Sequence, residues 1–297
     1  MNRLISRLRS LAHQPRTRRR NARLLQLLMA TTEVDWDVLG DYLLQHGLLT
    51  PNKLEPIKLQ HEAVLNQTSW IEPKTGLEMI WIPPGRFIKG HPDSHQRLNL
   101  PGFAISRHPV TNEAWLRFSQ ATRYPGHPST HADNPYLSHL EQSSPQHPVV
   151  NVSYVDVLHY CDWAELRLPT EAMWEKAARG VDGRVYPWGN RALHPQLANV
   201  SKGYSLPIGQ YPNIRTAYGC QDMVGNVADW CSPSDPHHHD EPPPTADVAL
   251  KHLLTWAPHR GGHYNSGHIQ VYNEHSMGVR RRQDWCSFRP VWLPIDP

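Results

Sequence analysis

Side chains suited to ligand contact gather near the C-terminus. Between Gly262 and Cys286 the chain carries several tyrosines, histidines, asparagines and arginines, together with Trp285. Such residues make strong contacts on loops, because they offer a large area at a small entropic cost. We therefore expect a ligand-binding surface at about 263–286, formed by His263, Tyr264, Asn265, His268, Tyr272, Arg282 and Trp285. An ordinary polar lid is the alternative interpretation.

Cysteines and histidines are the other groups that could carry chemistry. The chain has four cysteines, Cys161, Cys220, Cys231 and Cys286. They form no C-x-x-C pair, which argues against a zinc ribbon and against a disulfide framework. The run His237–His239, followed by Asp240, is of a kind that binds transition metals. Because three prolines follow at 242–244, we favour a solvated insertion.

The helices and strands that position these residues can be predicted from local sequence patterns. Thr170 suits a helix N-cap and Gly180 a C-terminal stop, so a helix is predicted between them with Trp174 on its inward face. Similar patterns predict strands over 77–82 and 102–106, a helix capped by Thr111, and a helix over 154–165 capped by Ser153. High proline and glycine contents, 28 and 18 residues, indicate many loops.

The order of the motifs resembles the formylglycine-generating enzyme (sulfatase-modifying factor) family. The resemblance rests on Arg167–Gly180, Tyr186–Asn190, Gly219–Trp230, His259–Gly262 and Phe288-Arg289, within a region from Gly76 to Trp292. It implies an α+β fold of the C-type-lectin-like class, loop-rich with short strands. Fold and function are separate questions, because function depends on particular sites.

The resemblance places the family's metal sites on particular residues. Copper-dependent members carry two cysteines after the Arg-Gly-Gly core, and soft thiolates hold Cu(I). Ser266 and Val271 occupy these positions here, so copper-dependent formylglycine synthesis is not expected. The iron site of the sulfoxide-forming branch needs a His-x-x-x-His-x-Glu pattern. His139 and Glu141 are present, but Pro135 replaces the first histidine. We expect neither copper nor iron.

Calcium is the metal that the resemblance does imply. The family's calcium loop maps onto the side chain of Asp222, the carbonyls of Gly225 and Val227, and the side chain of Asp229. Oxygen ligands of this kind suit Ca²⁺. Asp229 replaces a longer glutamate, and a turn held by hydrogen bonds alone is the alternative. Asn199-Val200 resembles the start of a second calcium site, but the downstream acidic ligands are absent.

The N-terminal segment is strongly basic. Residues 1–25 contain eight arginines and no acidic residue, whereas the whole chain has a net charge of only +3. Such a segment attracts nucleic acid or an acidic partner, and it is also typical of a solvated tail. We predict that 1–70 form a basic, mostly helical extension and that 71–297 form the main domain. With no predicted membrane span and no secretory signal, we expect a cytoplasmic, bacterial-type protein.

These observations favour a binding protein. Our first hypothesis is a non-catalytic protein on this fold that binds an unknown protein or small molecule at its C-terminal loops. The variable proteins of diversity-generating retroelements are the precedent that the resemblance supplies. One alternative is an enzyme with cysteine-independent chemistry, whose acid and base groups come from His263, Tyr264, His268 and Glu274. The other is a regulatory or scaffold subunit that acts through its arginine-rich N-terminus.

Overall fold

The computed structural model describes residues 36–48, 69–124, 144–233 and 255–293. The chain divides into two compact units, Met1–Trp70 with Leu293–Pro297, and Ile71–Trp292. In the first unit, helix α3 (Trp36–Gln45) buries Leu39 and Leu43. The chain turns after this helix at Gly47, whose φ is 58°. Within the described ranges, no helix combines the length and apolar character needed to cross a bilayer.

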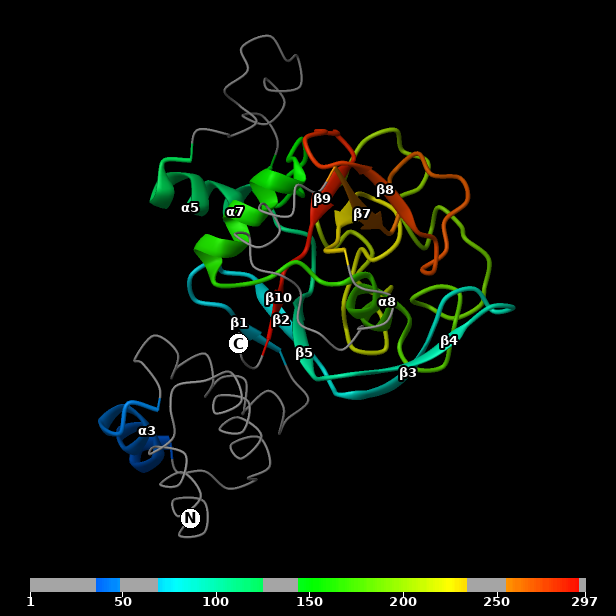
Figure 1. The fold of residues 1–297 in the computed structure, drawn as a ribbon. Coiled ribbons are helices and arrows are strands. Elements are labelled where there is room, and N and C mark those ends of the chain that lie inside the picture. Colours follow the sequence, from blue (N-terminus) through cyan, green and yellow to red (C-terminus); the bar gives the residue numbers. More distant parts are fainter. Residues whose placement is uncertain (1–35, 49–68, 125–143, 234–254, 294–297) are drawn as a thin grey trace. The chain divides into compact units, whose positions relative to one another are not determined.

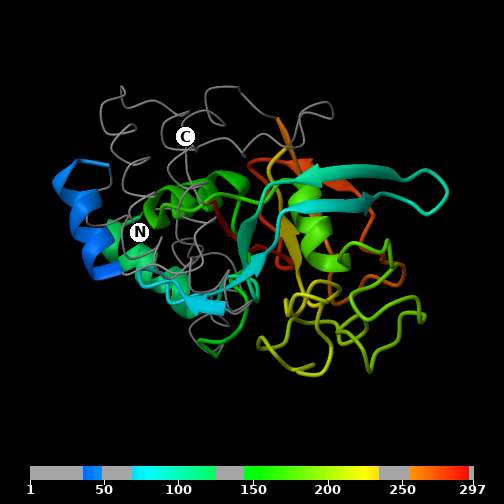
Figure 2. The same ribbon diagram turned by 90° about the horizontal axis from the view of Figure 1, so that it is seen from below.

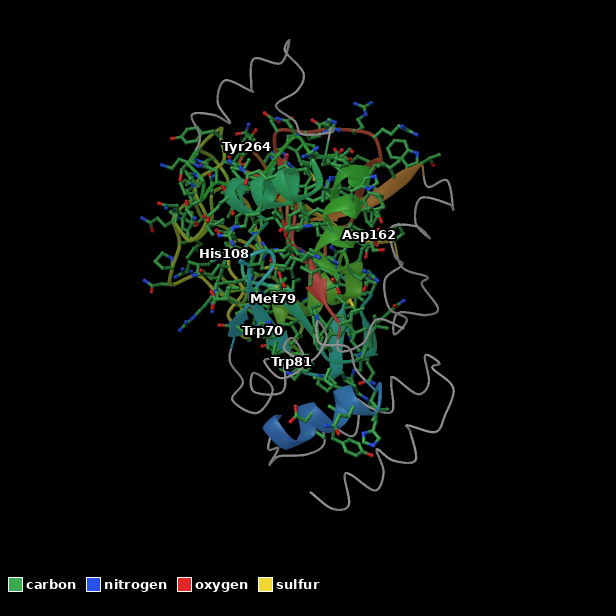
Figure 3. The ribbon with its side chains drawn as sticks, turned by 90° about the vertical axis from the view of Figure 1, so that its left-hand side faces the viewer. Trp70, Met79, Trp81, His108, Asp162 and Tyr264 are labelled. Atoms are coloured by element: carbon green, nitrogen blue, oxygen red, sulfur yellow. The ribbon has the colours of Figure 1, made fainter. Side chains whose placement is uncertain are left out.

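A four-stranded sheet joins distant parts of the sequence. Its order is β1-β2-β5-β10, with bounds Ser69–Ile71, Glu78–Ile82, Phe103–Ser106 and Val291–Trp292. Strand β5 pairs antiparallel with both neighbours, so Ile105 lies opposite Ile80 on one side and opposite Val291 on the other. All three are buried. Met79 in this sheet and Tyr264 in the C-terminal loops lie well apart (Figure 3). The strands predicted over 77–82 and 102–106 are confirmed.

Two helices, α5 (Asn112–Thr122) and α7 (Tyr154–Ala164), pack together through aromatic rings. Both begin at predicted caps: Thr111 accepts a bond from the third helical residue, and Ser153 forms a capping box with Asp156. The ring of Trp115 on α5 stacks on Tyr160 of α7 with centroids 5.7 Å apart. This aromatic contact fixes α7, which carries one of the supports of the C-terminal loops.

Helix α8 (Glu171–Arg179) is buried on every side. Thr170 caps it and Gly180 ends it, as the sequence predicts. Burial extends beyond the expected apolar face, because Glu175, Lys176 and Arg179 are also inside. Buried charges of this kind need partners. The C-terminal sheet and the loops beside it supply them.

A second four-stranded sheet carries the C-terminal half of the domain (Figure 1). Its order is β8-β7-β6-β9, with bounds His275–Gly278, Trp256–Arg260, Ala228–Trp230 and Cys286–Phe288. Strands β6 and β9 are parallel, and the other pairs are antiparallel. Asp229 lies opposite Arg260 and opposite Ser287. The expected loop surface at 263–286 thus contains a short strand, β8.

A hairpin extends from the domain (Figure 2). It consists of β3 (Gly85–Lys89) and β4 (Gln96–Leu100), paired antiparallel. No strand is predicted there from the sequence, because most of its side chains face outward and show no apolar pattern. Lys176 on α8 anchors its base, donating to the carbonyl oxygens of Pro83 at 2.7 Å and Gly85 at 3.1 Å.

Candidate ligand surface and cation site

The loop over 222–229 is held in left-handed backbone conformations. The φ angles are 53° at Asp222, 77° at Gly225 and 60° at Asn226. A Cβ at Gly225 would lie 2.5 Å from the carbonyl oxygen of Asn199, so the position requires glycine. The amide of Asn199 donates to Oδ1 of Asn226 at 3.0 Å. The predicted calcium loop is therefore built rigidly against the start of the predicted second site.

Asp229 on β6 is the most unusual member of this loop. Its Oδ2 accepts hydrogen bonds from Nε of Arg289 at 2.6 Å and from the indole of Trp174 at 2.9 Å. Its Oδ1 is buried and has no hydrogen-bond partner. Burial raises the pKa of the Asp229 carboxyl, although Arg289 opposes this. A buried carboxylate oxygen without a donor is the kind of group that ligates a cation.

Arg289 connects Asp229 to Asp222. Besides its pair with Asp229, the guanidinium donates to the carbonyl oxygen of Asp222 at 2.9 Å. The carboxylate of Asp222 accepts from the amide of Gly209 at 3.0 Å. Arg289 is fully buried and supplies part of the positive charge that a cation would supply. Two acidic side chains and one carboxylate oxygen without a donor remain in this loop, and oxygen donors of this kind are those that suit calcium.

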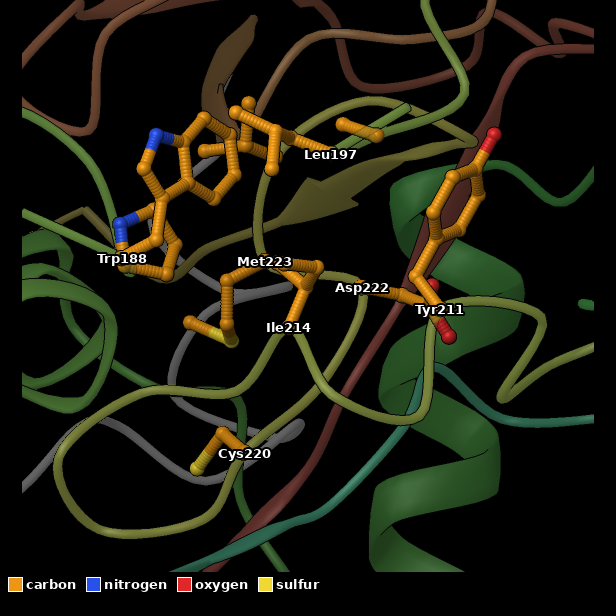
Figure 4. Close-up of a pocket in the computed structure, with 10 residues that line it drawn as sticks. Trp188, Leu197, Tyr211, Ile214, Cys220, Asp222 and Met223 are labelled. Atoms are coloured by element: carbon orange, nitrogen blue, oxygen red, sulfur yellow. The ribbon is translucent and has the colours of Figure 1, made fainter. Parts of the chain in front are cut away.

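A small pocket lies beside this loop (Figure 4). Its interior space is ≈ 10 Å³, which holds about one water molecule. Most of the residues that line it are apolar in type, and the lining consists of Pro187, Trp188, Leu197, Ala198, Tyr211, Ile214, Cys220, Asp222, Met223 and Val224. A space of this size does not hold an organic substrate.

Four rings form a continuous shelf on the C-terminal sheet. His263 stacks on Trp285 with centroids 4.7 Å apart, His259 lies 5.3 Å from Trp285, and His275 stacks on His259 at 5.6 Å. We call His259, His263, His275 and Trp285 the aromatic shelf. Burial lowers the pKa of His259 to about 4 and also lowers that of His263. Both imidazoles are therefore neutral at pH 7.

The predicted ligand residues that do not belong to the shelf differ in their exposure. Asn265 and His268 are exposed. Tyr272 is half-buried, with its ring over the guanidinium of Arg179 at 5.6 Å. Tyr264 is buried and donates its hydroxyl to Asp284 at 3.0 Å.

Arg282 ties the C-terminal loops to helix α7. Its two terminal nitrogens pair with the carboxylate of Asp156 on α7 at 2.7 and 2.9 Å, and one also donates to the carbonyl oxygen of Asn151. A bidentate pair of this kind fixes geometry as well as charge. Arg282 and Tyr264 thus hold the segment in place, whereas His263 and Trp285 of the shelf are half-buried and His275 is exposed.

A charged cluster beneath Tyr272 is not predicted from the sequence. Arg260 on β7 is fully buried and pairs with Glu175 at 2.5 Å, Glu171 at 3.3 Å and Glu274 at 3.2 Å. Glu274 also pairs with Lys89 on β3 at 2.7 Å. The sequence signal that could have indicated this cluster is the spacing of Glu171 and Glu175. They lie one helical turn apart, so their side chains face the same side of the helix.

Comparison with known proteins decides the family. Residues 67–293 match the sulfatase-modifying factor enzyme 1-like domain. The chain belongs to this family. The expectation from the sequence motifs is confirmed, and so is the α+β fold with short strands.

Relatives of the sulfatase-modifying factor family differ in how much of them this chain spans. It is 29% identical over 247 residues to the formylglycine-generating enzyme of Mycobacterium tuberculosis, covering 61% of this chain and 82% of that protein. It is 34% identical over 177 residues to the serine/threonine-protein kinase Pkn1 of Chlamydia trachomatis, covering 52% of this chain. The chain spans only 27% of that kinase's length.

Solved structures support the fold. PvdO from Pseudomonas aeruginosa superposes with a TM-score of 0.62 and 25% identity, covering 76% of this chain and 98% of that one. Treponema denticola variable protein 1 superposes with a TM-score of 0.57 and 18% identity, covering 76% and 98%. The second likeness concerns the fold alone.

The positions of the family's copper ligands do not fit copper here. The hydroxyl of Ser266 accepts a bond from the amide of His263 at 3.0 Å, and Val271 is fully buried. All four cysteines of the chain are buried and unpaired in disulfides. Burial raises the pKa of each thiol, to about 11 at Cys220. No cysteine is thus an accessible thiolate, which is the form that binds Cu(I).

Several predicted features lie outside the described residues. These are the arginine-rich segment 1–25, the partial iron motif with Pro135, His139 and Glu141, and the histidine run 237–239. Among the residues that the structure does describe, no three histidine, cysteine or acidic side chains gather as a metal-binding group. The predicted calcium loop differs from such a group, since it combines two carboxylates with two carbonyls.

Proposed function

We propose that this protein is a non-catalytic binding member of the sulfatase-modifying factor family and that its C-terminal loops, at about 263–286, hold the ligand. The observation that carries the proposal is the aromatic shelf. Its member His263 is hydrogen-bonded to Ser266, which together with Val271 stands where the copper enzymes have their reactive thiols. Stacked rings on a fixed sheet offer area at a low entropic cost, which suits recognition.

The polar contacts that hold the C-terminal loops favour a binding surface over a mobile lid. Arg282 and Tyr264 tie the segment to α7 and to Asp284 through polar bonds. A surface whose side chains are held before the ligand arrives loses less entropy on binding. The proposal includes the variable proteins of diversity-generating retroelements. The fold shared with Treponema denticola variable protein 1 is consistent with this type, but the fold alone does not distinguish it from other members of the family.

We include calcium as the resident cation of the loop at 222–229. Asp222 and Asp229 would bind it through their side chains and Gly225 and Val227 through their carbonyls. The unpartnered Oδ1 of Asp229 supports this assignment. Bound there, the ion would hold the loop and neutralise a buried carboxylate.

The N-terminal arginines extend the proposal to a second partner. Eight arginines without an acid in residues 1–25 would bind nucleic acid or an acidic protein, as in a regulatory or scaffold subunit. We place the protein in the bacterial cytoplasm on the sequence signals alone.

An enzyme with cysteine-independent chemistry is the second candidate. It is favoured by the 82% coverage of the Mycobacterium tuberculosis formylglycine-generating enzyme. Of its proposed acid and base groups, His263 has a pKa lowered by burial and Tyr264 is bonded to Asp284. His268 and Glu274 are the exposed ones.

A thermal-shift screen of defined small molecules and peptides tests the proposal. Compounds that raise the Tm of the full-length protein should lose that effect with Trp285→Ala and keep it with Tyr204→Ala. Tyr204 is the matched control because it is an exposed aromatic residue outside the shelf, with 60% exposure. The same samples receive copper and a sulfatase-motif peptide. Aldehyde formation, or turnover of a ligand that depends on His268 or Glu274, would refute a non-catalytic role.

A further inference from the structure

The charged cluster joins the hairpin to the C-terminal loops and is separate from the aromatic shelf. Arg260 lies at its centre with no exposed side-chain surface. One terminal nitrogen reaches Glu171 and Glu274, at 3.3 and 3.2 Å. The other reaches Glu175, which also pairs with Arg179 at 2.7 Å. Every acidic partner therefore meets a cation, and all but one of these partners belong to α8.

Glu274 is the exception, because it comes from a loop and faces solvent. Its side chain is 52% exposed, against 19% for Glu171 and 0% for Glu175. Its Oε1 lies 2.7 Å from Nζ of Lys89 and 3.2 Å from Nη1 of Arg260. A single carboxylate oxygen is thus held between two cations at the edge of the domain.

The charges of the cluster balance only while Glu274 is present. There are three cations and three carboxylates: Arg179, Arg260, Lys89, Glu171, Glu175 and Glu274. Moving Glu274 away leaves one positive charge without a partner. Because Arg260 is fully buried and Lys89 is only 15% exposed, water screens that charge poorly. Another anion would therefore be drawn to the same place.

We propose that Lys89 and Arg260 form a carboxylate-binding site whose internal occupant is Glu274, displaced when a ligand carboxylate binds. This goes beyond the proposed function, because it adds a second ligand site to the C-terminal loops, apart from the aromatic shelf and with its own chemical class of ligand. A carboxylate suits the site because the present occupant is one and because guanidinium groups pair with carboxylates in a fixed geometry. The ligand is either a free organic acid or an acidic side chain of a protein.

Removing the charge of Glu274 tests the site directly. Glu274→Gln preserves the size of the side chain, and full-length protein is titrated with succinate by calorimetry at low salt. We expect succinate to bind about tenfold more tightly than to the wild type, because the internal competitor is neutral. Adding Lys89→Met should abolish the gain. Glu113→Gln is the matched control, since Glu113 is a similarly exposed carboxylate that pairs with Arg117 on α5.

Further comparisons identify the source of the ligand carboxylate and the results that would overturn the proposal. Tighter binding of a glutamate-rich peptide than of succinate supports an acidic protein ligand, and equal binding supports a small acid. Unchanged succinate affinity in Glu274→Gln, or tighter binding of inorganic phosphate, overturns the proposal. Glu274→Ala undergoes the same comparison if the glutamine variant is unfolded. Trp285→Ala should leave succinate binding intact, so failure of the shelf is distinguishable from failure of this site.

Discussion

His259 should make the stability of this protein depend on pH between about 4 and 6.5. The side chain is 9% exposed, lies between Trp285 and His275, and has a buried Nδ1 without a hydrogen-bond partner. Burial, followed by the charges of His275 and His263, lowers its pKa from 6.5 to about 4. Below pH 6.5 the unfolded chain binds a proton on this imidazole, whereas the folded chain does not until the pH falls to about 4.

The sign and size follow from that difference. Since the unfolded state binds more protons across this window, the free energy of unfolding falls as the pH falls. Each pH unit contributes about 1.4 kcal/mol, so the loss from this residue reaches about 3 kcal/mol near pH 4. His259→Phe keeps an aromatic ring of similar size in the shelf and removes the titrating group.

Denaturant unfolding at several pH values measures the effect. The wild type should lose about 3 kcal/mol more than His259→Phe between pH 7 and pH 4. NMR titration of the imidazole carbon-bound protons gives the pKa independently. His263→Gln should raise the pKa of His259, because it removes a neighbouring histidine charge. Parallel pH profiles for the wild type and His259→Phe would refute the reasoning.

Three further predictions concern the cation loop, the buried arginine and the N-terminus. Calcium should raise the Tm of the wild type and EDTA should lower it, whereas Asp222→Ala should show neither change; equal responses of both proteins would contradict the site. Arg289→Leu should destabilise the fold by about 3–5 kcal/mol, because it leaves Asp229 buried without its cation, and Arg289→Leu with Asp229→Asn should recover part of the loss in denaturant unfolding. Protein truncated to begin at Ser69 should keep the fold by circular dichroism but lose salt-sensitive retention of nucleic acid or an acidic protein, and equal gel shifts for both lengths would show a solvating tail.

The local elements could be predicted because their signals are local. Thr170 and Gly180 mark the ends of α8, and Ser153 with Asp156 marks the start of α7, through bonds to residues within a few positions. The hairpin β3–β4 escaped prediction because its strands are held by their pairing and by Lys176 on a distant helix. The five residues of either strand carry no local pattern that indicates these contacts with distant segments.

The candidate sites show the same limit at the level of side chains. The sequence predicted ligand residues across one segment but could not separate His263, which joins the shelf, from Arg282, which is tied to Asp156. It assigned Asp229 to a predicted calcium loop without showing that Arg289 already pairs with one of its oxygens. Those distinctions depend on contacts between segments far apart in the chain, where residue type alone carries little information.

Two buried arginines hold loops of this fold through contacts that need no thiol. Arg289 holds the loop at 222–229 through the carbonyl of Asp222 and the carboxylate of Asp229. Arg260 holds the loop before β8 through the carbonyl of Val271 and through Glu274. At Val271 the contact uses the backbone, so it does not depend on whether that position carries a thiol. The framework therefore holds this loop without needing a cysteine at position 271, and under the proposed function the outward side chains of the loop bind another ligand.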